Sequence, residues 1–144
     1  MREQGVKVSA AYNTVYRQAS GPRLYAGSLM GLDDRAGCTL PAPVRVGLID
    51  GPVDTTNADL RGVNLTVRSF LPDDSKPGDT GHATAIASLI SSPPGGDAGA
   101  GLAIGARLHV ASVFSDEGKS DLAQVDAIAE AVDWLLQQRV QVIG

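Results

Sequence analysis

The sequence predicts an α/β protein in which a parallel sheet is flanked by helices. Apolar, strand-like runs at 44–50, 63–71 and 107–114 alternate with helix-like runs at 82–91 and 121–138. The final run, VQVIG, begins a further apolar strand and stops at Gly144. Because half of such a sheet is then unbuilt, we expect the sheet to be incomplete in this chain.

Composition limits the classes of protein that the chain can belong to. Its 144 residues fit one domain, and a hydrophobic content of 43% is typical of a globular protein. Twelve Lys and Arg residues against sixteen Asp and Glu residues give a net charge of -4 without a basic cluster, so no nucleic-acid partner is expected. Aromatic residues make up only 4%, which predicts an aliphatic, alanine-rich core.

Several further features are absent from the sequence. Cys38 is the single cysteine and cannot form an internal disulfide, and His82 and His109 are too few for a structural zinc set. No window approaches the roughly 20 apolar residues of a membrane span. The first residues also lack the apolar centre of a signal peptide.

Residues 1–42 differ from the rest of the chain. They are rich in glycine, contain Pro22 and Pro41 with Pro43 just beyond, and show no sustained helical or alternating period. We therefore predict an irregular N-terminal leader or linker over 1–42, surface-lying or poorly ordered, and a domain over 43–144. The alternative is an irregular arm that packs on a missing part of the protein.

The run VRVGLID predicts a central strand that ends on a carboxylate. Its apolar residues fall on both faces, with Val44, Val46 and Leu48 on one and Gly47 and Ile49 on the other. Asp50 then stands at the carboxyl end, before Gly51 and Pro52. Open α/β sheets carry their sites at this edge. Position alone leaves a second interpretation equally open, in which Asp50 only caps a turn.

The next helix is predicted to begin with a histidine. A second strand candidate at 63–71 is followed by a loop, and a small apolar helix covers 82–91 with Asp79 or Thr80 as its N-cap. In the first turn, His82 feels the positive end of the helix dipole, which favours a neutral ring. A neutral ring can act as a general base. Taken alone, however, a single histidine is more simply a capping or packing residue.

The last third of the sequence predicts a strand, a helix and the start of another strand. His109 alternates within the strand 107–114 and is interpreted as a packed or edge residue. Apolar residues recur at helical spacing from Asp121 to Gln138, and Asp121 with Gln124 resembles a capping pair. The apolar edge at 140–143 is expected to pair with other chains, so we expect this chain to self-associate.

Four segments in order resemble the subtilisin-like serine proteases, the subtilases. VRVGLIDGPVDTTNADL is similar to the family's signature around the triad aspartate, and GHATAIASLI to the signature around the triad histidine. GLAIGARLHVASVF resembles its glycine-alanine-proline loop and following strand, and AIAEAVDWLLQQRVQVIG its Trp-containing helix. The resemblance covers 44–144 without a break, so 43–144 is identified as the N-terminal half of a subtilisin-like peptidase domain.

The resemblance implies a serine-type endopeptidase that hydrolyses peptide bonds with an Asp-His-Ser triad. Asp50 and His82 would be the catalytic aspartate and histidine, and the substrate a polypeptide. None of the serines here lies in the family's Gly-Thr-Ser-Met-Ala context, so the nucleophile and the oxyanion donor stay unassigned, and the chain alone is expected to be inactive. Relatives are commonly exported, which implies an extracytoplasmic protein although no export signal is visible.

Departures from the family pattern leave alternatives open. Gly51-Pro52 replaces the usual Ser/Thr-Gly, and Ala83 replaces the glycine after the histidine. No cofactor is expected, and the calcium that many relatives bind is not expected either, because the loop 91–99 offers only Asp97 as a charged ligand. The alternatives are a catalytically inactive, subtilase-like interaction domain or truncated fragment and, third, an unrelated α/β ligand-binding domain.

Overall fold

The computed structural model of the chain describes residues 15–17, 43–95, 100–116, 118 and 121–144. Its strands are β1 Val15–Arg17, β2 Arg45–Asp50, β3 Asn64–Ser69, β4 Arg107–Ser112, β5 Phe114–Asp116, β6 Asp121–Gln124 and β7 Val142–Ile143. Its helices are α2 Gly81–Ser91, α3 Val125–Gln137 and the short 3-10 helix η2 Ala58–Leu60. Among the described residues, no helix is long and apolar enough to cross a membrane.

The main sheet is four-stranded and parallel, in the order β3-β4-β2-β7. Strand β2 lies inside it and pairs with β4 along its whole length, from Arg45 opposite Arg107 to Asp50 opposite Ser112. The short strand β7 forms one edge, where Val142 and Ile143 are exposed. The sequence-based prediction of a parallel α/β sheet with apolar central strands is therefore confirmed.

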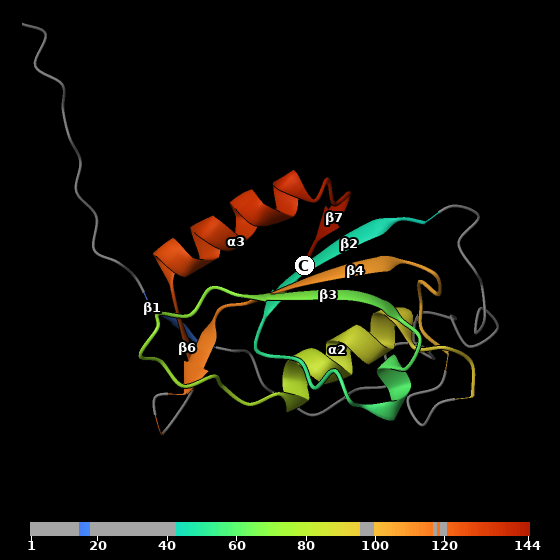
Figure 1. The fold of residues 1–144 in the computed structure, drawn as a ribbon, viewed down its shortest axis with the longest axis horizontal. Helices are drawn as coiled ribbons and strands as arrows, with labels where there is room; N and C mark the ends of the chain where they lie inside the picture. Colours follow the sequence, from blue (N-terminus) through green and yellow to red (C-terminus); the bar gives the residue numbers. More distant parts are fainter. Residues whose placement is uncertain (1–14, 18–42, 96–99, 117, 119–120) are drawn as a thin grey trace, which may run out of the picture.

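Helix α3 covers one face of this sheet and α2 covers the other (Figure 1). The first layer contains the buried residues Ala111, Val113, Ala123, Ala127, Ala131, Trp134 and Leu135. The second contains Leu48, Leu60, Ala87, Leu108 and Val110. Gly47 allows α3 to approach closely, since a Cβ atom there would lie 3.0 Å from two methyl groups of Leu135. Burial on both faces explains why β2 and β4 are almost wholly apolar.

A second, antiparallel sheet in the order β1-β6-β5 corrects two predicted boundaries. The helix expected from Asp121 begins only at Val125, because Asp121–Gln124 pairs with Phe114–Asp116 and with Val15–Arg17. The single strand expected over 107–114 ends at Ser112, after which β5 turns into the second sheet. Most of the leader predicted over 1–42, with Cys38, lies outside the described residues.

Candidate active site

Asp50 ends β2 at the carboxyl edge of the parallel sheet, as the sequence predicts. The residue is 5% exposed, and its Oδ1 accepts a hydrogen bond of 2.6 Å from the backbone N–H of Gly51. Its carbonyl oxygen accepts the N–H of Val113 at 2.9 Å. The first bond gives the buried carboxylate a hydrogen-bond donor, and the second fixes the main chain where β2 ends.

His82 lies in the first turn of α2 and faces this carboxylate. Its Nδ1 is 2.9 Å from Oδ2 and 3.0 Å from Oδ1 of Asp50. The side chain of His82 is 39% exposed and that of Asp50 only 7%. A carboxylate at Nδ1 selects the tautomer with its proton on that atom and leaves the Nε2 lone pair available for a second group. The pair can therefore orient the ring and stabilise it when it takes a proton.

Thr84 connects the chain segment after Asp50 to the helix that carries His82. Its Oγ1 accepts the N–H of Asp54 at 2.9 Å and donates to the carbonyl of Thr80 at 2.6 Å. Asp54 in turn accepts hydrogen bonds from the hydroxyl and N–H of Thr56, and these lower the pKa of Asp54 below its usual value of 3.8. The sequence pointed to Thr84 only through the family signature and gave no sign of this link.

The start of α2 depends on two aspartates. Thr80 is the N-cap residue but makes no side-chain capping bond, whereas Oδ1 of Asp79 accepts the N–H of Gly81 at 2.8 Å. Oδ2 of Asp121 accepts the N–H of Asp79 at 2.9 Å. Asp121 was expected to cap α3. Instead, its carboxylate binds the main chain at Asp79, directly before the helix that carries His82.

The described parts of the chain contain no group of three or more His, Cys, Asp or Glu residues that could hold a metal ion. Asp97, the one charged ligand in the loop considered for calcium, lies outside the described residues. Ala83, which stands where the family has glycine, is fully buried beside His82.

Solved structures of proteases resemble this fold. A mutant of the protease domain of PatA matches with a TM-score of 0.58 and 26% identity, over 69% of this chain and 36% of that one. The patellamide maturation protease PatA matches with a TM-score of 0.57 and 25% identity, over 74% and 37%. The prenylagaramide maturation protease PagA is 22% identical with a TM-score of 0.53 over 83% and 38%, which shows the fold alone.

This chain thus spans little more than a third of the solved proteases that it resembles. No curated protein matches it. The family model described as "Subtilase family" matches residues 42–144, which include strand β2 with Asp50 and helix α2 with His82. That match covers most of the sequence and agrees with the parallel sheet and the protease neighbours. The chain belongs to the subtilase family.

Proposed function

We propose that this chain contributes the aspartate and histidine of a serine-type endopeptidase. The observation that carries the proposal is the contact of the half-exposed His82 ring, through Nδ1, with both oxygens of the buried Asp50. The nucleophilic serine and the oxyanion donors would come from a part of the protein outside these 144 residues. The substrate would be a polypeptide.

In this mechanism, Nε2 of His82 takes the proton of the serine hydroxyl as that oxygen attacks the scissile carbonyl carbon. The same nitrogen then returns the proton to the leaving amine. Asp50 keeps the proton of the neutral ring on Nδ1 and stabilises the imidazolium that forms between the two steps. Burial of the carboxylate strengthens this interaction, since little water screens it.

The proposal is tested on the longer protein. Its coding sequence beyond these residues should encode a serine in a Gly-Thr-Ser-Met-Ala-like context and an asparagine before it. The protein expressed from it should hydrolyse a peptide substrate and be blocked by a serine-directed inhibitor. Asp50→Asn should reduce kcat by about 10⁴-fold, because the wrong tautomer of His82 then prevails. Ser88→Ala, on the same helix but away from the pair, is the matched control and should leave kcat unchanged.

Two outcomes would contradict the proposal. If the longer protein lacks the serine, the non-catalytic interaction domain becomes the better interpretation. If Asp50→Asn and Ser88→Ala reduce kcat equally, the Asp50–His82 contact is only structural. The 144-residue chain alone should give no turnover, and inhibitor-sensitive cleavage by it would show that a serine within these residues is the nucleophile.

A further inference from the structure

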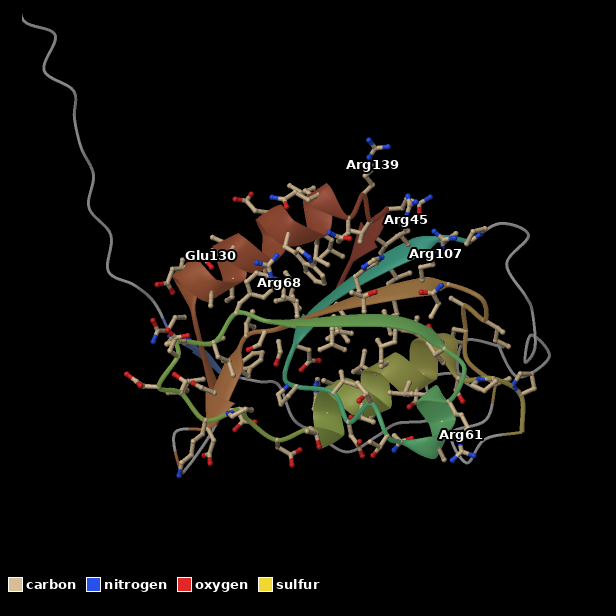
Figure 2. The ribbon with its side chains drawn as sticks, in the orientation of Figure 1. Arg45, Arg61, Arg68, Arg107, Glu130 and Arg139 are labelled. Carbon is tan, nitrogen blue, oxygen red and sulfur yellow. The ribbon has the colours of Figure 1, made fainter. Side chains whose placement is uncertain are left out.

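A basic pocket lies at the opposite end of the sheet from Asp50. It has a volume of about 440 Å³ and is lined by Arg45, Asn64, Arg107, His109, Gln137, Gln138 and Arg139. Every one of these side chains is cationic or a neutral hydrogen-bonding group, and none is acidic. Figure 2 shows Arg45, Arg107 and Arg139 together at this end, whereas Arg61 and Glu130 lie elsewhere. The volume is sufficient for a small-molecule ligand.

The register of the sheet forces two of these positive charges together. Arg45 and Arg107 are the first residues of β2 and β4 and lie directly opposite each other. Asn64, at the start of β3, is the next partner of Arg107 in the same row. Like charges opposite one another on neighbouring strands destabilise a sheet. Within the described part of the chain, no carboxylate lies within 4.0 Å of either guanidinium group to neutralise this pair of arginines.

The third arginine occupies an unfavourable backbone conformation. Arg139 has φ 56°, the left-handed region in which helices commonly end on glycine. It is the only non-glycine residue with positive φ among those described. The C-terminal end of α3 supplies only about half a negative charge, which is too little for three guanidinium groups. Backbone strain and uncompensated charge therefore coincide at this pocket.

His109 adds two buried polar atoms to the same place. Both ring nitrogens are inaccessible to water and have no hydrogen-bond partner in the described part of the chain. The ring lies edge-on to Trp134, with 6.0 Å between centroids. Burial, Arg45 and Arg107, in that order of effect, lower the pKa of His109 below 6.5, as expected in a positive environment. Buried polar groups without partners in a native structure call for an explanation.

We propose that this pocket binds a small ligand carrying phosphate or carboxylate groups. Guanidinium groups form paired hydrogen bonds with such oxyanions, and three of them line this pocket on a protein whose net charge is -4. The bound oxyanion neutralises the opposed pair Arg45 and Arg107 and gives Arg139 a partner. The site lies away from the catalytic pair and does not depend on the proposed peptidase activity.

The experiment titrates the purified chain with pyrophosphate and, separately, with citrate, at ionic strength held constant with sodium chloride. Trp134, the single tryptophan, reports binding by fluorescence, and His109 reports it by the NMR shift of its ring at fixed pH, with His82 as an internal control. We expect saturable binding of at least one oxyanion. Comparison of the two titrations shows whether phosphate or carboxylate groups are preferred.

Variants distinguish binding in the pocket from a general effect of the protein's charge. Arg45→Gln and Arg107→Gln should each weaken binding about tenfold or more, because each removes a charge-assisted hydrogen bond. Arg61→Gln, an exposed arginine away from the pocket, should leave the affinity unchanged. Arg139→Gly should weaken binding yet raise the stability of the fold, since glycine accepts positive φ. If the pocket arginines have only a structural role, all four variants should bind the oxyanion with the same affinity.

Absence of saturable binding by both oxyanions would overturn the proposal. So would an equal loss in Arg61→Gln and Arg45→Gln, which would show that binding follows net charge alone. A shift of the His82 ring as large as that of His109 would place the ligand at the wrong end of the sheet and would also refute it.

Discussion

The hydroxyl of Thr84 offers the sharpest test of how the candidate site is held together. Thr84→Val keeps the shape of the side chain and removes its oxygen. The N–H of Asp54 then loses its acceptor, and the segment after Asp50 is no longer tied to α2. The carbonyl of Thr80 loses one of two donors but keeps the backbone N–H of residue 84 at 3.1 Å.

The expected loss of stability comes from the N–H of Asp54, because the carbonyl of Thr80 keeps a donor. An unpaired backbone N–H costs about 1–3 kcal/mol when it is buried. Because Asp54 is only half-buried and water can partly replace the lost bond, we expect Thr84→Val to lower the free energy of unfolding by about 1–2 kcal/mol. At roughly 3 °C per kcal/mol for a chain of this size, Tm should fall by about 3–6 °C.

Urea unfolding followed by the fluorescence of Trp134, at one chain concentration, measures the effect. Ser88→Ala is the matched control, because the Ser88 hydroxyl donates only to the Thr84 carbonyl within the same helix. Its loss should change stability by less than about 0.5 kcal/mol, since alanine is the better helix former. If the two variants are equally stable, the hydrogen bond from Asp54 to Thr84 does not stabilise this part of the fold, and our reasoning is wrong.

Three further predictions concern packing, association and pH. Gly101→Ala should destabilise the fold by about 3 kcal/mol in urea unfolding, since its Cβ would lie 2.7 Å from the backbone oxygen of Ile90, whereas Gly144→Ala should be neutral. Sedimentation should find the chain self-associated and Val142→Lys less so; a monomeric wild type would contradict the exposed-edge argument. The pKa of His109 is lowered in the fold, so as pH falls the unfolded chain takes up a proton at this ring before the folded chain does. The free energy of unfolding should therefore decrease as pH drops through about 6.5. The same dependence of stability on pH in His109→Gln would refute this.

Sequence reasoning recovered the parts of the fold that are decided locally or by burial on both faces. The strand ending at Asp50 and the helix beginning near His82 have strong apolar patterns, and their bounds agree within one residue. The family signatures supplied the reason to consider these two residues together. The structure brings their side chains within 3.0 Å, and their catalytic role stays a proposal.

The rest depends on contacts between distant residues. Asp121–Gln124 continues the helical period of α3, yet it is a strand because partners from two other segments are available to it. The basic pocket was equally hidden, since Arg45 and Arg107 are isolated in sequence and meet only through the register of β2 and β4. Arginine at the first position of two strands that become neighbours in the parallel sheet is the signal that could have revealed it.

The strand order has a consequence for how the chain folds as it is synthesised. Strand β2 is made early, but both of its neighbours, β4 and β7, follow much later in the sequence. Until they emerge from the ribosome, β2 has no partner for its backbone hydrogen bonds, and forming such long-range pairs is slow. The strand that carries Asp50 can therefore be fixed only after α2 and β4 have been made, so the Asp50–His82 pair should become ordered later than the helix that carries His82.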